Sequence, residues 1–312
     1  MKYYISKSTQ SDENPLEIKK SEYDSILLGY KNISQAIFLE EKFDLLLLNY
    51  YEYEKDLLDT AWYSLLFNDV RQDRLTENRN LLTRRIINLL STSNMYVEQC
   101  NSHVGEIFNQ DIKVLEDLQQ FISTQFDTYL GYRVCYKLRN FSMHFDLPSN
   151  LITNSFRNDE QDDGKTYIKS ITIPGITLSF LKRDSKYSNK VIQELESEFG
   201  EIIDIRPLLR EYILGITKIN DYIRNLISKD FESWFQSIYI ILRRLRKESD
   251  NQINFYIFKQ ENNGSYIPRL ISWEFLNRRT FYINKNNIDD NFLLYYSSNQ
   301  IRNNDVKKIK AR

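Results

Sequence analysis

The sequence predicts a mainly α-helical protein that carries two small β-containing insertions. Only 8 glycines and 5 prolines occur among 312 residues, and a chain with few turn-forming residues favours long helices. Apolar residues recur at three- and four-residue intervals over most of the chain, which is the spacing of an amphipathic helix. Around residues 150–184 and 252–284, β-branched and aromatic residues gather between turn signals, which is typical of strands.

Helical periodicity dominates the middle of the chain. In the first predicted helix, Phe43, Leu46, Tyr50 and Leu57 recur at helical spacing, and polar residues separate them. The predicted helices run from Ser34 to Phe67, from Thr76 to about Val104, within 111–145 with an interruption near Ser123, and from Asn189 to about Lys247 with a break near Arg206-Pro207.

Strand-like stretches lie before, within and after these helices. The insertion at 150–184 is predicted to be a β-hairpin or a small β-excursion, and residues 252–284 to contain further strands. The strand-like segments are Tyr3–Ile5, Ile26–Leu28, Ile168–Leu178, Phe255–Phe258 and Ile271–Trp273, with turns expected at Asp159–Gly164, Pro174-Gly175 and Asn262–Gly264.

No internal repeat and no low-complexity linker divides the chain, so we expect one helical body with β-structured additions. Residues 1–33 form a mixed N-terminal segment. Residues 34–250 form the helical domain, which contains the insertion at 150–184. Residues 251–312 form a C-terminal extension with β-structure and a basic tail, Lys307–Arg312.

Charge and cysteine content restrict the function classes. The 42 basic and 43 acidic residues give a formal net charge of -1, so binding to nucleic acid must come from local patches. Cys100 and Cys135 are the only cysteines, and no Cys/His cluster accompanies them. This pattern argues against a zinc site and fits a reducing compartment. No phosphate-binding or dinucleotide-binding glycine motif occurs, so no cofactor and no metal are expected.

The chain shows no sign of a membrane or export segment. Residues 1–5 lack the long apolar core of a signal peptide. Apolar runs such as Leu45–Leu48 are short and flanked by charge, far below the length of a membrane span. We therefore expect a soluble cytoplasmic protein.

A short motif near the end of the third predicted helix combines an arginine with one of only two histidines. Arg139–His144 reads R-N-x-x-x-H. At 100° per residue, one polar arc of roughly 80° holds Arg133, Tyr136, Asn140 and His144, with Arg139 beside it. A separate apolar arc, which should face the core, holds Val134, Leu138, Phe141 and Phe145.

This motif suits phosphodiester chemistry. Pro148 disfavours a helical Leu147, so His144 falls in the last turn, where the helix dipole favours its protonated form. Histidine exchanges protons near neutral pH, and arginine holds a phosphate and stabilises charge on its oxygens. The alternative is a surface arginine beside a histidine that only caps the helix.

These residues resemble the HEPN superfamily. Its signature is an arginine, a polar residue and, after four to six intervening residues, a histidine at the end of a core helix. Here the signature falls on Arg139, Asn140 and His144. The resemblance covers roughly residues 34–147 and the helices after 189, and it implies a HEPN-like helical bundle.

Many HEPN proteins are metal-independent endoribonucleases of toxin–antitoxin, abortive-infection and CRISPR-associated systems, and their composite active site usually forms where two HEPN domains meet. This chain has one such motif. The resemblance therefore implies RNA as the substrate, with tRNA among the candidates. It also implies a homodimer, or an antitoxin or defence-system partner that completes or restrains the site.

By this resemblance, the ribose 2′-OH attacks the adjacent phosphate and leaves a 2′,3′-cyclic phosphate and a 5′-OH, so DNA is not a substrate. His144 would act as general base or acid, Arg139 would stabilise the developing charge, and Asn140 would orient His144 or bind phosphate. One toxin branch carries a tyrosine two positions after the histidine, which its partner modifies. Asp146 occupies that position here, so this modification is not expected.

Further side chains are candidates for RNA binding. Arg133 and Tyr136 share the polar arc of the motif, and a tyrosine can stack on a base. Arg243, Arg244 and Arg246 end the last predicted helix. They form either a phosphate-binding patch or the positive charge that compensates a helix dipole.

Two other functions fit the same sequence. The chain could be a catalytically inactive HEPN-like module that binds nucleotides or proteins. It could also be a helical scaffold or sensor subunit of a defence complex, which recognises its partner through the insertion at 150–184.

Overall fold

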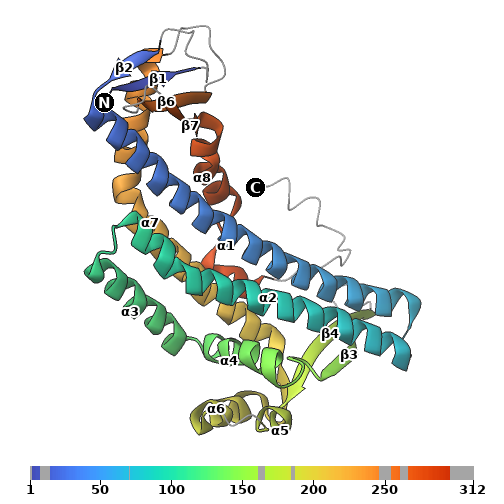
Figure 1. Ribbon diagram of the computed structural model, residues 1–312. Coiled ribbons are helices and arrows are strands. Elements are labelled where there is room, and N and C mark those ends of the chain that lie inside the picture. Colours follow the sequence, from blue (N-terminus) through green and yellow to red (C-terminus); the bar gives the residue numbers. More distant parts are fainter. Residues whose placement is uncertain are drawn as a thin grey trace.

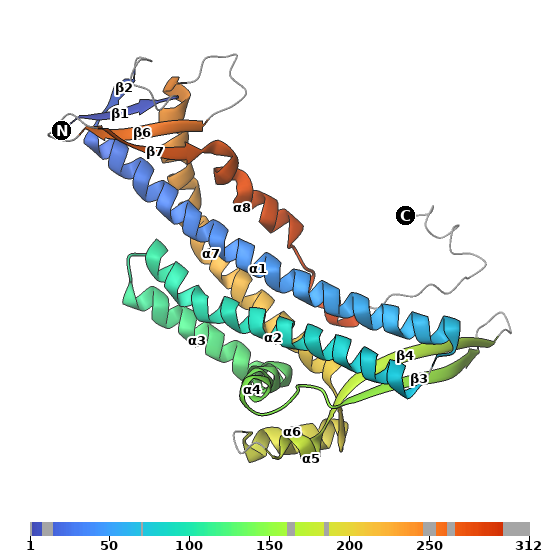
Figure 2. The same ribbon diagram turned by 45° about the vertical axis from the view of Figure 1, so that its right-hand side comes forward.

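Three long helices run side by side through the molecule (Figures 1 and 2). They are α1 (Lys20–Phe67), α2 (Gln72–Ile107) and α7 (Ile205–Leu245). The computed structural model describes residues 2–7, 15–69, 71–160, 166–183, 187–245, 254–260 and 266–295. Within these ranges most residues are helical, which confirms the predicted mainly α-helical class.

Shorter helices complete the body on either side of α7. The pair α3 (Ile112–Thr128) and α4 (Leu130–His144) packs against α2 and α7. The other short helices are α5 (Leu178–Leu181), α6 (Asn189–Phe199), α8 (Trp273–Lys285) and the 3-10 helix η1 (Asp290–Leu294).

A four-stranded antiparallel sheet covers one end of α1 and α7 (Figure 1). Its order is β2-β1-β6-β7, from β1 (Tyr3–Ser6), β2 (Leu16–Ile18), β6 (Asn254–Gln260) and β7 (Tyr266–Ser272). Tyr4 pairs with Phe258. The N-terminal and C-terminal segments, which the sequence treats separately, thus meet in one sheet.

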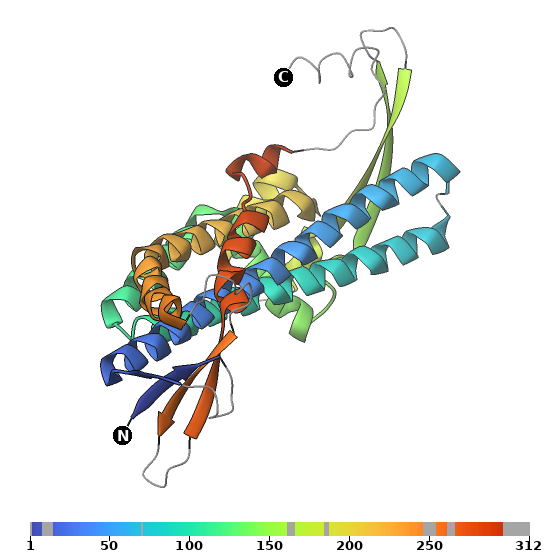
Figure 3. The ribbon, with the colours of Figure 1, turned by 90° about the horizontal axis from the view of Figure 1, so that it is seen from above.

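The predicted hairpin is present and extends past the helices (Figure 3). β3 (Leu151–Glu160) pairs with β4 (Thr166–Thr177), and β5 (Ile202–Asp204) adds a third strand. Pro174-Gly175 was predicted to be a turn, which is wrong, because both residues lie within β4 opposite Ile152 and Leu151. Of the predicted acidic turn, Asp159-Glu160 ends β3, and residues 161–165 lie outside the described residues.

Several element boundaries differ from the prediction, and three of them have a plain physical reason. Ile26–Leu28 belongs to α1, since Tyr23, Ile26 and Ile33 are buried at helical spacing. The interruption between α3 and α4 falls at Tyr129, whose backbone is extended, and Ser123 stays helical. Trp273 begins α8 and does not extend β7, because the Ser272 hydroxyl accepts the Phe275 N–H at 3.3 Å and caps the helix.

Charged and polar contacts inside the body join the long helices. The Glu40 carboxylate of α1 is buried and accepts two N–H groups from Arg224 of α7, at 2.9 and 2.7 Å. The Tyr96 hydroxyl of α2 donates to Asn220 of α7 at 2.7 Å. A buried charge is tolerated only when it is paired and hydrogen-bonded, so these contacts specify which faces of the helices meet.

Two glycines allow α4 to cross α7 at close range. A Cβ atom on Gly131 would overlap the Leu208 carbonyl oxygen and lie 2.7 Å from Cβ of Glu211. A Cβ atom on Gly215 would lie 2.7 Å from the ring of Tyr132. Each glycine thus leaves room for the other helix: Gly131 for the α7 backbone and Glu211, and Gly215 for the Tyr132 ring. This close crossing fixes the position of α4, whose C-terminal end carries the motif.

Across the described ranges, no helix combines the length and the apolar character that a membrane crossing requires.

We expect Gly131→Ala to destabilise the fold by about 1–3 kcal/mol, because the added methyl group has no space against the α7 backbone. Urea unfolding monitored by circular dichroism measures the change. Gly29→Ala is the control, since a Cβ there would lie 3.1 Å from the Trp234 carbonyl oxygen and should cost less. Equal effects at the two glycines would contradict the close crossing.

The second histidine predicts a pH dependence of stability. His103 of α2 is half-buried, and its Nδ1 lies 2.6 Å from the Gln35 side-chain oxygen of α1. Burial lowers the pKa of His103, Lys42 lowers it further, and Glu106 partly opposes them. The folded pKa lies below the ordinary value of 6.5, so the unfolded chain binds the proton more strongly.

The free energy of unfolding should therefore fall as the pH drops below about 6.5. Melting temperatures of the wild type and of His103→Gln, measured between about pH 7 and pH 5, test this. Glutamine does not titrate, so the variant should lose less stability over that interval. A wild-type slope equal to that of the variant would show that His103 is not responsible.

Candidate functional site

α4 carries the predicted motif, and contacts at both ends hold it in place. At its start, the Glu211 carboxylate of α7 accepts the Gly131 N–H at 2.8 Å, which supplies the negative charge that a helix N-terminus favours. The N-capping residue, Tyr129, provides no side-chain cap of its own. At its end, the Phe145 N–H donates to the Phe141 carbonyl at 2.8 Å, and the chain then turns toward buried Pro148.

The motif residues lie at the C-terminal end of this helix. Nη1 of half-buried Arg139 donates to Oδ1 of Asn140 at 2.9 Å. Nε of Arg139 is buried and has no hydrogen-bond partner among the described residues. The charge of Arg139 also acts on Tyr212 of α7, whose pKa burial raises and Arg139 partly lowers. A guanidinium held in this way keeps Nη2 available for an anion.

His144 lies in the last turn of α4, as predicted, and its side chain is exposed. It forms no hydrogen bond or ion pair within the described part of the chain. Asn140 precedes it by one helical turn and shares its face. Asn140 and His144 therefore lie on one side of the C-terminal end of α4, and His144 is reached directly from solvent.

Apolar side chains surround His144. Met143 is 54% exposed, Phe145 48% and Leu147 45%. Phe145 was predicted to face the core, which is wrong: helical geometry stops at His144, and the Phe145 ring turns to the surface beside the Arg183 guanidinium, 5.4 Å away. The other three members of the predicted apolar arc, Val134, Leu138 and Phe141, are buried.

Arg133 and Tyr136 lie on α4 but are engaged by neighbouring helices. Arg133 forms an ion pair with Glu194 of α6 and donates to the Asp127 carbonyl. The Tyr136 ring packs edge-on against Phe126 of α3, with ring centroids 5.8 Å apart. Tyr136 remains 43% exposed, whereas an RNA phosphate would have to compete with Glu194 for Arg133.

The second group of RNA-binding candidates lies at the other end of the molecule. From Gly215, where α7 crosses α4, to Arg243 the helix rises about 40 Å. Arg243 is exposed, and Arg244 forms an ion pair of 2.7 Å with Glu22. Arg246 and the basic tail lie outside the described residues. Within one chain, the structure does not bring Arg243 and Arg244 to the motif.

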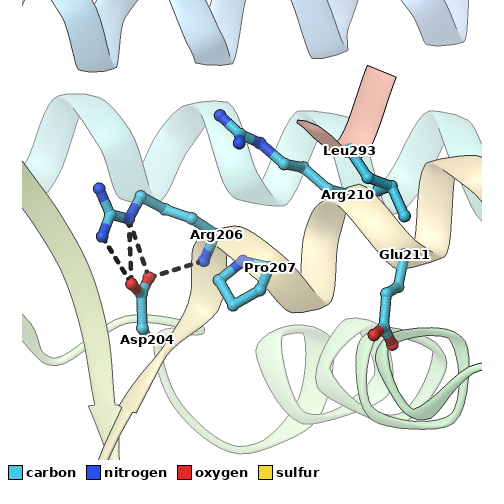
Figure 4. A pocket seen from close by; sticks show the side chains of 6 residues that line it. All are labelled: Asp204, Arg206, Pro207, Arg210, Glu211 and Leu293. Atoms are coloured by element: carbon cyan, nitrogen blue, oxygen red, sulfur yellow. Dashed lines mark hydrogen bonds and ion pairs between the residues drawn. The ribbon is translucent and has the colours of Figure 1, made fainter. Parts of the chain in front are cut away.

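A pocket of about 320 Å³ opens where α7 begins (Figure 4). Arg206 and Arg210 point to one side of α7, and Glu211 points away from them toward α4. Each arginine is held by a carboxylate: Arg206 by Asp204 at 2.7 Å, and Arg210 by Glu54 of α1 at 2.8 Å. Because these charges are already paired, an anion would have to displace a carboxylate to bind there.

This pocket could not be recognised in the sequence, because one of its two ion pairs joins residues far apart in the chain. Arg210 and Glu54 are separated by 156 positions. Only Arg206-Pro207 was noted, as a helix break. The helices do break, but just before these residues: α6 ends at Phe199, β5 follows, and α7 begins at Ile205. Asp204 accepts the Arg206 N–H at 2.9 Å at the start of α7, and a proline in the first turn disturbs no helix hydrogen bond.

Cysteines and metal ligands offer no second site. Cys100 and Cys135 are both fully buried and unpaired. Burial raises the pKa of the Cys100 thiol to about 12 and raises that of Cys135 as well, so neither thiol supplies a thiolate near neutral pH. Among the described residues, no three His, Cys, Asp or Glu side chains are grouped to hold a metal ion.

Comparisons with protein-family models, with curated proteins and with solved structures found no match to this chain.

We expect Glu211→Ala to lower the free energy of unfolding by about 1 kcal/mol, because the start of α4 loses its acceptor and its negative charge. Glu211→Gln keeps an acceptor and should lose less. Hydrogen exchange of the first amides of α4 reports the effect locally. Unchanged exchange of these amides in Glu211→Ala would show that the contact does not hold α4.

Proposed function

We propose that this protein is an endoribonuclease whose site contains Arg139, Asn140 and His144. One observation carries the proposal: an anchored arginine–asparagine pair and an exposed histidine share the C-terminal end of α4. The arginine supplies a fixed positive charge for a phosphate, and the histidine supplies a proton-exchanging group at the same end of the helix. The resemblance of this motif to the HEPN signature supports the same chemistry.

In the proposed reaction, a base removes the proton of a ribose 2′-OH, and the 2′-oxygen attacks the adjacent phosphorus. The bond from phosphorus to the 5′-oxygen breaks, and an acid protonates that oxygen. The products are a 2′,3′-cyclic phosphate and a 5′-OH end. Arg139 stabilises the negative charge that builds up on the phosphate oxygens, and Asn140 fixes the position of Arg139 through the bond at 2.9 Å.

This reaction moves two protons, and each chain offers one exposed imidazole. The other histidine, His103, is half-buried against Gln35 in α2. We therefore propose that a second copy supplies the second His144, as in the composite sites of HEPN proteins. The exposed apolar side chains around His144 support this arrangement, because pairing would remove them from water.

The biological role that we propose is a toxin or an abortive-infection or antiphage effector, restrained by an antitoxin or a defence-system partner. This part rests on the resemblance. The net charge of -1 supports local RNA contacts over attraction by the whole surface.

A scaffold or sensor role is the second candidate. The extension of the β3–β4 hairpin past the helices favours it (Figure 3), as do the exposed Phe156 and Ile168 near its tip. A scaffold would keep its cellular phenotype in His144→Ala and lose it when the hairpin is altered.

The test incubates purified protein with total RNA and tRNA in EDTA and maps the fragment ends. We expect wild type to leave 2′,3′-cyclic phosphates, and His144→Ala and Arg139→Ala to cleave at least about 100-fold more slowly, as for the loss of an acid–base or charge-stabilising group. A substrate with 2′-deoxyribose at the cleavage site should remain intact.

His103→Gln is the matched control, since it removes the other histidine and should retain cleavage. Equal cleavage by wild type and folded His144→Ala would exclude the proposed site. If wild type leaves all RNA intact after any inhibitor has been removed, the nuclease proposal fails and the scaffold role gains support.

A further inference from the structure

The outer face of α1 is unusually apolar for a surface helix. Among the large side chains that are exposed on its second half, five lie on one side: Leu48 (43%), Tyr51 (64%), Leu58 (53%), Trp62 (53%) and Leu66 (58%). At 100° per residue they fall within an arc of about 80°, which we call the α1 stripe. The opposite side of the same helix is buried in the core through Phe43, Leu46, Tyr53 and Leu57, so α1 is apolar on two faces.

The size of the α1 stripe suits a protein interface. A large apolar side chain exposes roughly 200 Å² in full, so five half-exposed ones present on the order of 500 Å². A standard interface buries about 800 Å² on each partner, with a polar rim included. Tryptophan and tyrosine, both present here, dominate the binding energy of such interfaces.

The charged residues in and beside the α1 stripe are placed so that two copies of the stripe complement each other. The stripe runs from Leu48 to Leu66, and residue 57 is its midpoint. If two copies pack with their α1 helices antiparallel about a twofold axis at this midpoint, Lys55 of each copy lies beside Asp59 of the other. The interface then contains two such ion pairs. Both side chains are exposed and neither forms an ion pair within the described part of the chain. Pairing them within one helix is the less favourable order, because the lysine precedes the acid.

We infer that the α1 stripe binds a second copy of this chain, with the two α1 helices antiparallel and Lys55 of each copy paired with Asp59 of the other. The motif end lies apart from this contact, because α2 and α7 separate α4 from α1 (Figures 1 and 2). The inference is therefore independent of the proposed nuclease function and of any pairing through His144.

Sedimentation analysis of the full chain tests the interface. We expect Leu58→Asp and Trp62→Glu to halve the mass of the wild-type assembly and to raise the dissociation constant roughly 30-fold or more. Ile112→Asp is the control: it places the same charge on an apolar side chain that is 72% exposed at the start of α3, and it should leave the mass unchanged.

Charge exchange and crosslinking test the antiparallel order. Lys55→Glu and Asp59→Lys should each weaken the assembly, and the double variant should restore it. Because Cys100 and Cys135 are fully buried, Leu48→Cys combined with Leu66→Cys should give an intermolecular disulfide, which neither single variant gives.

Three outcomes overturn the inference: a wild-type monomer at about 100 µM, far above the dissociation constant of a specific interface; a mass that Leu58→Asp and Trp62→Glu leave unchanged; or crosslinking by Leu48→Cys alone, which indicates parallel helices. A monomer would assign the α1 stripe to another protein or to residues 296–312 of the same chain.

Discussion

The close crossing of α4 over α7 determines where the candidate site lies. Gly131 and Gly215 remove the side chains that would keep the helices apart, and Glu211 then reaches the first amides of α4. With its start held there, α4 extends to His144 at the surface. The buried pair Arg224–Glu40 acts in the same way further along α7, where it specifies the face that meets α1. The glycines let two helices pack closely, and the paired charges determine which helix faces meet.

Sequence patterns predicted those structural features that depend on residues close together in the chain. The motif of Arg139, Asn140 and His144 could be recognised in the sequence because all three residues belong to one helix. The α1 boundary was wrong because Ile26–Leu28 resembles a strand in a short window, whereas its helical period appears only together with Tyr23 and Ile33. Contacts between distant segments could not be predicted. They include the ion pair of Arg133 with Glu194 and the pair of Arg210 with Glu54.

We propose that two apolar surfaces of the molecule each bind another copy of the chain. Apolar side chains around His144 would be covered when two sites meet, while the α1 stripe pairs on the far side of α2 and α7. A chain with two self-complementary faces builds either a closed tetramer or an open fibre. The relative orientation of the contact at His144 and the contact at the α1 stripe therefore decides whether assembly ends at a closed tetramer or continues as a fibre.

The sheet that joins the two ends of the chain also sets an order of events during synthesis. Tyr3 pairs with Lys259, so β1 emerges from the ribosome long before its partner strand exists. At about 5–20 residues per second, this delay amounts to roughly 10–50 s. The helices α1 and α2 meet through nearby sequence and can associate during that time. The four-stranded sheet closes last, and a ribosome that stalls before β6 leaves a helical body with an unpaired strand edge open to aggregation.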